Sequence, residues 1–308
     1  MEKLGNARFA RYAWGVLAYN VLVILWGAVV RVTGSGAGCG NHWPTCNGEV
    51  LPQAPAMHTM IEFTHRMMTG LDGPMIILLI VWAFRGFPKL HPVRRAAIWT
   101  GVFLVTESLI GAALVKFDYV AQSAAVGRGP WLAIHLMNTL TLVACLALTA
   151  WWGGGRPRVR FAGRPAWIAG ATLGSVMLLG VSGAIAALGD TLFPAHSLVT
   201  GFAQDISAGA HIFLRLRAIH PMLAALVAAW LLFYAITTPR GQGTPYARWL
   251  LVMVVAQLTA GVLNLVLLAP AWLQIVHLLL ADLLWIALVL LCAARLGLQG
   301  KGEEVAHS

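Results

Sequence analysis

The residues of this chain that could do chemistry gather in the stretch 34–70. Cys39 and Cys46 lie in a segment broken by glycine and proline, and a long apolar run that opens with Glu62 and His65 follows it. Two thiols can form a disulfide or bind a metal, an imidazole can ligate iron, and a carboxylate can exchange a proton or balance a positive charge. Ionisable side chains are costly inside an apolar span, so these residues predict a functional site.

The composition indicates what kind of chain carries them. Of the 308 residues, 59% are hydrophobic and only 10% are charged, and the mean hydropathy is +0.77. These values lie far outside the range of soluble domains and predict an all-α polytopic membrane protein surrounded by membrane lipid. The formal charge of +10 does not indicate a nucleic-acid partner, because the basic residues occupy short loops between apolar runs.

Eight apolar runs are long enough to cross a hydrocarbon core about 30 Å thick, which takes roughly 20 helical residues. We expect the first run to be retained as a span, because it is too long for a removable signal peptide and lacks a small-residue cleavage site. The eight predicted spans cover residues 12–30, 60–84, 96–116, 131–152, 167–188, 212–236, 247–268 and 272–294.

The basic residues predict the orientation of the chain. Fifteen lysines and arginines flank the spans on the side of the N-terminal tail, against five on the other side, namely Arg31, Lys116, Arg128, Arg215 and Arg217. Short loops rich in Lys and Arg stay in the cytoplasm. We therefore expect a multi-pass protein of the cell membrane with both termini in the cytoplasm and with the loop that carries Cys39 and Cys46 outside.

Outside the cytoplasm a pair of thiols can persist as a disulfide. Cys39 and Cys46 are seven positions apart in a segment rich in turns, which can bring them within bonding reach. The alternatives are two unpaired loop thiols or a zinc site. Zinc is disfavoured, because the spacing is not C-x-x-C and only two histidines are near in the sequence.

The two halves of the chain resemble each other. Three pairs of segments align with offsets of 155, 150 and 142 residues, and they are 63–71 with 217–226, 108–115 with 257–266, and 130–148 with 271–291. Four spans per repeat give both halves the same orientation. The sequence therefore predicts two tandem, similarly oriented four-helix bundles, one over residues 1–155 and one over residues 156–308.

The repeat places four histidines in equivalent positions, His65, His135, His220 and His277. Each lies near the outer beginning of an even-numbered span, so we expect the four imidazoles at similar depth, two in each bundle. Imidazole is a good axial ligand for haem iron, and a bundle core offers the long apolar slot that a porphyrin needs. A single histidine in a span is more often a hydrogen-bonding residue between helices, but four equivalent ones favour haem ligation.

Glu62 precedes His65 by three residues, so both side chains project from one helix face. Its carboxylate could act as a general acid or base, or stabilise positive charge that develops on a substrate. Equally, it could be a glutamate favoured by a helix N-terminus, or a partner of Arg66. For the deeper Glu107 and Asp282 we expect polar pairing inside the bundle, with a proton path as the alternative.

The second half has no acidic residue at the place of Glu62. Arg215 and Arg217 precede His220 instead, and they could pair with the propionates of a haem. The two halves have therefore diverged, and we expect one bundle to react and the other to hold a redox cofactor. His196 and His211 flank the longest outer loop of the second half, and we assign them no role.

The segments GSGAGCGNHWPTCNG and IEFTHRMMTG, at residues 34–48 and 61–70, resemble the haem A synthase family, as do the eight spans and the four equivalent histidines. The resemblance extends over essentially the whole chain, and a Gly-Cys-x6-Cys loop followed by E-F-x-H-R is highly specific. It implies an enzyme that oxidises the C8 methyl group of haem O to a formyl group, by successive hydroxylation and loss of water. The product would be the haem A that terminal oxidases require.

The resemblance also implies roles for individual residues. His220 and His277 would ligate a haem b cofactor in the C-terminal half, while His65 and His135 would address the iron of the substrate haem O in the N-terminal half. Glu62 matches the essential glutamate of the family. The cysteines match the bacterial forms with one such loop, and the second pair that some relatives carry in the C-terminal half is absent from this sequence.

Two partners follow from this resemblance, a haem O synthase that supplies the substrate and an electron donor that the sequence does not identify. The chain has no flavin, nicotinamide or iron–sulfur motif of its own. An alternative class is a bis-histidine membrane cytochrome that transfers electrons without substrate chemistry, and a third is a haem exporter. A cytochrome would explain the four histidines, but it would not explain why Glu62 and the cysteines occur in one half only.

Overall fold

The computed structural model describes residues 6–241 and 243–306, with side chains as far as residue 297 in the last helix. Eight helices in this part of the chain are long and apolar enough to span a membrane, which confirms the predicted fold class and the number of spans. Lys3 and the side chain of Lys301 belong to the fifteen basic residues counted above, and they lie outside the described part.

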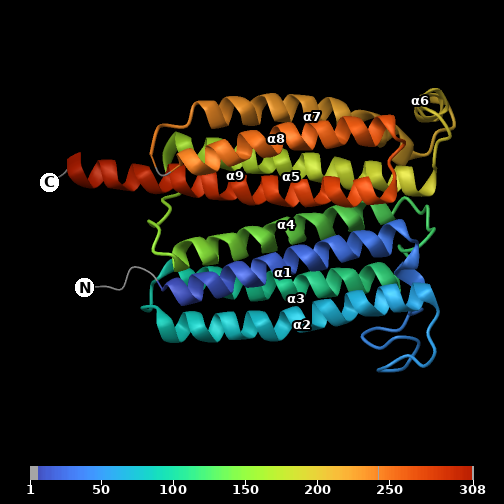
Figure 1. Ribbon diagram of the computed structural model, residues 1–308, viewed down its shortest axis with the longest axis horizontal. Helices are drawn as coiled ribbons and strands as arrows, with labels where there is room; N and C mark the ends of the chain where they lie inside the picture. Colours follow the sequence, from blue (N-terminus) through green and yellow to red (C-terminus); the bar gives the residue numbers. More distant parts are fainter. Residues whose placement is uncertain (1–5, 242, 307–308) are drawn as a thin grey trace.

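The spanning helices are α1 (Ala7–Val32), α2 (Met57–Gly86), α3 (Pro92–Lys116), α4 (Arg128–Gly153), α5 (Gly163–Leu192), α7 (Ile212–Ile236), α8 (Thr244–Val266) and α9 (Ala271–Ala306). A short 3-10 turn, η1 (Ser35–Ala37), follows α1, and a short helix, α6 (Leu198–Ile206), lies between α5 and α7. Both belong to connections at the end of the molecule where α1 and α5 end (Figure 1). We call this the cysteine-loop end, because the connection from α1 to α2 carries both loop cysteines.

The helices form two groups that lie side by side in Figure 1. Helices α1 to α4 pack against one another, and α5, α7, α8 and α9 form the second group. The groups meet where α4 contacts α5 and α9, and where α1 contacts α9. The beginning of α1 and the end of α9 lie at the same end of the molecule. This arrangement is consistent with the two tandem, similarly oriented bundles expected from the repeat.

The apolar core lies along the seam between the two groups. In an apolar stretch of 18 residues, 56% of the residues are buried in α9, against 17% in α8. Helix α9 is therefore central and α8 peripheral. Across the seam, the indole Nε1 of Trp285 donates a hydrogen bond to the carbonyl oxygen of Leu140 at 2.7 Å. The exposed apolar side chains of α8 are ordinary for a surface that faces lipid.

Local signals in the sequence explain where individual helices begin. The side chain of Asn6 accepts hydrogen bonds from the backbone N–H groups of Arg8 and Phe9, which would otherwise be unpaired in the first turn of α1. Ser197 and Thr200 form a capping box that starts α6. The predicted outer loop of the second half therefore contains a short helix that the hydrophobic pattern of the spans did not indicate.

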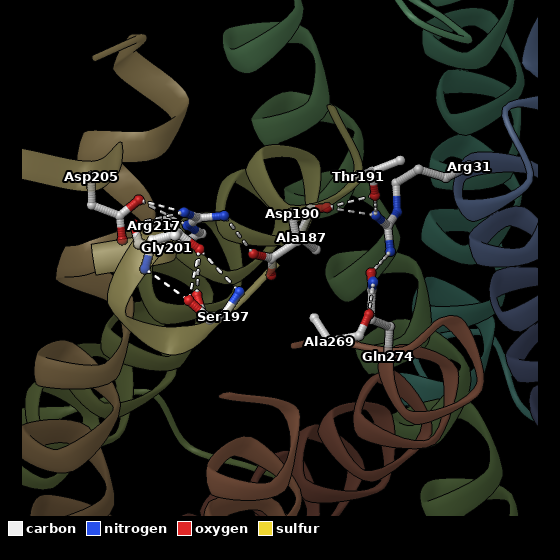
Figure 2. A network of polar contacts seen from close by, with 11 residues as sticks. Arg31, Ala187, Asp190, Thr191, Ser197, Gly201, Asp205, Arg217, Ala269 and Gln274 are labelled. Atoms are coloured by element: carbon white, nitrogen blue, oxygen red, sulfur yellow. Dashed lines mark hydrogen bonds and ion pairs between the residues drawn. The ribbon is translucent and has the colours of Figure 1, made fainter. Parts of the chain in front are cut away.

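Arg31 joins the two groups at the cysteine-loop end, as Figure 2 shows. From the last turn of α1, its guanidinium donates to the carbonyl oxygen of Ala187 and the hydroxyl of Thr191, both at 2.9 Å, and to Oε1 of Gln274 at 3.0 Å. Gln274 in turn donates to the carbonyl oxygen of Ala269 at 2.7 Å. One cation of the first group therefore satisfies acceptors on two helices of the second.

Arg31→Ala should loosen the seam, because it leaves three acceptors of the second group without their donor. Hydrogen bonds to charged groups contribute about 1.5 to 3 kcal/mol, so the thermal transition of the purified protein in detergent should move to lower temperature. Arg11→Ala is the matched control, since Arg11 is an exposed arginine of the same helix. Equal transition temperatures for the two variants would contradict a role of Arg31 in joining the halves.

Candidate functional site

Two of the predicted site histidines come together in the first group of helices. His65 is the ninth residue of α2 and His135 the eighth residue of α4, and their imidazoles are close enough to interact electrostatically. Both Nδ1 atoms are buried without a hydrogen-bond partner, whereas the side chain of His135 as a whole is 30% exposed. A buried polar atom without a partner is unfavourable, so it calls for a ligand or another compensating contact.

The second group repeats this arrangement. His220 is the ninth residue of α7 and His277 the seventh residue of α9, and these imidazoles also lie within electrostatic range of each other. The Nδ1 atom of His220 is 2.9 Å from the hydroxyl of Ser182, while Nδ1 of His277 is buried without a partner. All four histidines therefore lie about 10 Å along their helices from the cysteine-loop end, at 1.5 Å per residue.

Each of the four imidazoles rests against a glycine of a neighbouring helix. A Cβ atom added to the glycine would lie closest to the imidazole Cε1 atom in every case. The distances would be 3.2 Å for Gly27 and His65, 3.9 Å for Gly111 and His135, 2.9 Å for Gly183 and His220, and 3.4 Å for Gly261 and His277. The glycines therefore clear the space that the rings occupy.

The sequence analysis did not single out these glycines, which the structure places against the four histidines. Gly183 follows Gly27 by 156 residues and Gly261 follows Gly111 by 150 residues, so the glycines keep the spacing of the repeat. The alignment of 108–115 with 257–266 already paired Gly111 with Gly261. That signal could have been followed, but the sequence alone does not give the neighbour of each glycine.

Glu107 of α3 lies beside His135, with 3.5 Å between its Oε1 atom and the histidine Nδ1. Its Oε2 atom accepts a hydrogen bond from the amide of Asn138 at 2.6 Å, and Oε1 accepts one from the hydroxyl of Thr139. The polar pairing expected for Glu107 is confirmed. The same pairing is not found for Asp282, which is 2% exposed and whose Oδ2 atom has no partner among the described residues.

The cysteine loop is closed by a disulfide between Cys39 and Cys46, as predicted, so neither sulfur is available to zinc. Glu62, which is 3% exposed, fastens this loop to α2. Its Oε2 atom accepts the backbone N–H of Cys39 at 2.8 Å, and its Oε1 atom is 2.5 Å from Nη2 of Arg66. Arg66 also donates to the carbonyl oxygens of His42 and Thr45, at 2.6 and 2.5 Å.

The interpretation of Glu62 as a partner of Arg66 is confirmed, and its catalytic role stays a prediction. The carboxylate is charge-balanced by Arg66, buried and held by one further contact, the N–H group of Cys39, and it lies one turn of α2 before His65. A carboxylate held in this way can act on a neighbouring group without reorganising.

The arginines before His220 have partners of their own. Arg217 pairs with Asp190 at 2.9 Å and with Asp205 of α6 at 2.6 Å (Figure 2). Arg215 is exposed and donates to the carbonyl oxygen of Ala208 at 2.8 Å. In the repeat, Arg217 occupies the place of Glu62, and each of these residues ties a connection at the cysteine-loop end to its helix.

His196 and His211 received no role in the sequence analysis. His196 is exposed before α6, and the ring of His211 accepts the backbone N–H of Phe213 at the start of α7. Among the side chains that the structure describes, in residues 6–241 and 243–297, no three of His, Cys, Asp or Glu converge as ligands of a metal ion. A haem needs only axial ligands from the protein, because the porphyrin supplies the other four.

Glu62→Ala should release the cysteine loop from α2, because it removes the acceptor of the Cys39 N–H group and the partner of Arg66. Hydrogen bonds to charged groups contribute about 1.5 to 3 kcal/mol, so local opening should become on the order of 10-fold more frequent. The rate at which dithiothreitol reduces the disulfide, followed by alkylation and mass spectrometry, measures this opening. Glu49→Ala is the control, since Glu49 lies in the same loop but contacts only Gln53 of that loop through its side chain. Identical reduction rates would contradict the anchoring role.

Comparisons with known proteins support the resemblance to the haem A synthase family. Residues 10–289 match a family model described as cytochrome oxidase assembly protein. The chain is 38% identical over 130 residues to a haem A synthase of Alkalihalophilus pseudofirmus, a match that covers 42% of this chain and 41% of the relative. It is 34% identical over 140 residues to a haem A synthase of Bacillus mycoides, covering 45% and 44%.

A relative from Thermus thermophilus, named protoheme IX farnesyltransferase, is 45% identical over 313 residues, which is 98% of this chain and 52% of that protein. The chain thus spans about half the length of this relative. The family model, in contrast, matches nearly all of the chain from one end of the spans to the other. The chain therefore belongs to the cytochrome oxidase assembly protein family, which is the family of the haem A synthases.

Proposed function

We propose that this chain is a haem A synthase that oxidises the C8 methyl group of haem O to a formyl group in successive hydroxylations. The single observation that carries the proposal is the pair of histidine sites, alike in both halves, of which only one lies under a disulfide loop fastened by a buried glutamate. A protein that only transfers electrons has no need of this difference. Membership of the cytochrome oxidase assembly family supports the same conclusion.

The residues present fit a haem in each half. Three of the four Nδ1 atoms are buried without hydrogen-bond partners, and the four glycines let the imidazoles pack closely against the neighbouring helices, which would hold the rings in place for a ligand. In the C-terminal half, His220 and His277 would hold haem b, which supplies a one-electron redox centre when bound. Arg215 and Arg217 would face its propionates. Arg215 is the freer of the two, because Arg217 is already shared between two carboxylates.

In the N-terminal half, His65 and His135 would bind the iron of haem O and so fix the position of the porphyrin edge that reacts. Glu62 would be the catalytic carboxylate, able to hold a proton or to balance positive charge near the methyl group. Its contacts with Arg66 and with the Cys39 N–H group keep it in one position. The disulfide loop would cover the site and exclude water from it.

The same proposal includes the orientation of the chain. Fifteen basic residues flank the spans on the side where α1 begins, against five at the cysteine-loop end, which supports cytoplasmic termini and an external loop in the cell membrane. The reaction would then take place near the outer surface. The electron donor would be a separate component of the membrane.

A haem O synthase is the partner that this function requires, since it supplies the farnesylated substrate. The Thermus relative bears the name of a protohaem farnesyltransferase, and this chain matches about half of it. We infer that the present chain corresponds to the haem-oxidising part and that it works beside a farnesyltransferase. Farnesyl transfer by the chain itself is the competing possibility that the same relative raises.

Expression with and without a haem O synthase tests the function. With the synthase, we expect the purified protein to yield haem A, identified by chromatography and mass spectrometry of the extracted pigment. Glu62→Ala should leave haem O or a hydroxylated intermediate, because the substrate site remains while the carboxylate is lost. Haem B alone in both proteins would favour the bis-histidine cytochrome, and haem O formed without the added synthase would favour farnesyl transfer.

Gly183→Ala tests the haem b site by changing the residue against which His220 packs. The added Cβ would lie 2.9 Å from Cε1 of His220, so the imidazole must move, and retention of haem b should weaken on the order of 10-fold. Gly170→Ala is the matched control on α5, because its Cβ would meet nothing within 4 Å. Haem content per chain, measured as the pyridine haemochrome, gives the comparison. Equal content in the two variants would argue against His220 as a ligand.

A further inference from the structure

Glu107 forms a polar cluster with His135 that has no role in the function proposed so far. The carboxylate reaches from α3 to α4, and both of its oxygens accept hydrogen bonds, one from Thr139 and one from Asn138. Its Oε1 atom lies 3.5 Å from Nδ1 of His135, and it is the only acidic group that the structure places against that nitrogen among the described residues. The cluster therefore fixes a negative charge behind the imidazole.

The other half of the molecule has the corresponding positions but not the charge. With the offset of 150 residues that relates Gly111 to Gly261, the counterpart of Glu107 is Gln257. Its side-chain Nε2 atom lies 3.3 Å from Nε2 of His277, so a neutral amide adjoins the equivalent imidazole, at the other ring nitrogen from the one that Glu107 approaches in His135.

The two residues that orient Glu107 are missing from the second half as well. With the offset of 142 residues that relates His135 to His277, Asn138 and Thr139 correspond to Leu280 and Ala281. The whole cluster is thus confined to the N-terminal half. A carboxylate that only tied two helices together would serve equally well in either half, so its restriction to one histidine site points to that histidine.

A carboxylate beside a ligand histidine has a well-understood effect on that histidine. A ligating histidine commonly turns its second ring N–H toward a carboxylate, which fixes the tautomer and the ring orientation and makes the ligating nitrogen a stronger donor. In this structure Nδ1 of His135 lies 3.5 Å from Oε1 of Glu107 without a hydrogen bond between them. A small rotation of the ring on ligand binding would let a proton on Nδ1 reach the carboxylate and leave the lone pair on Nε2 for the iron. A stronger donor stabilises oxidised iron relative to reduced iron.

We propose that Glu107 is a positioning residue that holds His135 for an iron ligand and strengthens it as a donor, so that the two halves differ in the potential of their haems. The inference rests on the proposed function, because it takes His135 as the ligand of the N-terminal haem. It assigns to Glu107 a task beyond helix pairing. It also gives the substrate half the more strongly donating site and the cofactor half the neutral one.

Neutralising the Glu107 side chain tests the proposal. Glu107→Gln gives the first half the amide of the second and keeps the length of the side chain, and its one carbonyl oxygen can accept from Thr139 or from Asn138. Each full-length protein would be purified in detergent, titrated with ferric protohaem as the probe, and examined by potentiometric titration of its visible spectrum. His135→Ala identifies the spectral component of the N-terminal site.

Glu107→Gln should shift the potential of that component in the positive direction and weaken its affinity for ferric haem about 10- to 100-fold. In the His135→Ala background, Glu107→Gln should have no further effect, because its influence passes through the imidazole. Glu107→Asp should restore part of the wild-type potential, since it restores the charge.

An unchanged potential in Glu107→Gln, with haem still bound through His135, would overturn the role of Glu107 and leave the proposed function intact. A loss of affinity that is additive with His135→Ala would also overturn it, because that result describes a purely structural residue. If the spectrum of His135→Ala were identical to that of the wild type, His135 would not be a haem ligand. Both proposals would then fail together.

Discussion

A polar side chain inside a membrane span must find its partner within the protein, because hydrocarbon offers none. In this chain the constraint decides where chemistry can occur. Arg31, Glu62 and Glu107 all lie in apolar helices. Arg31 and Glu107 each make two or more contacts with another helix, while Glu62 accepts the Cys39 N–H group of the loop and pairs with Arg66 of its own helix. Three imidazole Nδ1 atoms are buried without a hydrogen-bond partner, and so are polar atoms of other described residues, Oδ2 of Asp282 and Oε1 of Gln257 among them. The satisfied groups build the frame that positions the histidines.

The internal repeat separates what both halves need from what only one half needs. The histidines and the glycines behind them recur in both halves, which is what the proposed haem site in each half would require. The groups around them have diverged in charge, from Glu62 to Arg217 and from Glu107 to Gln257. Only the first half has a disulfide in its connection at the cysteine-loop end. Differences at a few neighbouring positions therefore make the two histidine pairs chemically different.

Much of this architecture could be predicted from the sequence. Apolar runs gave the spans to within a few residues, as in the predicted 96–116 against Pro92–Lys116 for α3, and spacing in a turn-rich segment gave the Cys39–Cys46 disulfide. Contacts between helices could not be predicted in the same way. The approach of Glu107 to His135 depends on the register of α3 against α4, and the pairing of Arg217 with Asp205 depends on α6 folding back onto α7. Hydropathy carries no information on either.

The contacts across the seam explain why two such sites belong in one chain. Trp285 binds the carbonyl oxygen of Leu140 in the middle of the seam, and Arg31 binds three acceptors at the cysteine-loop end. These two contacts lie at different heights along α4 and α1, so they oppose both sliding and rotation of one bundle against the other. Under the proposed function, electron transfer between a haem in each half would depend on a fixed separation, which lipid between separate subunits would not provide. The continuous buried seam would supply that separation, and it keeps the two histidine pairs at the same depth.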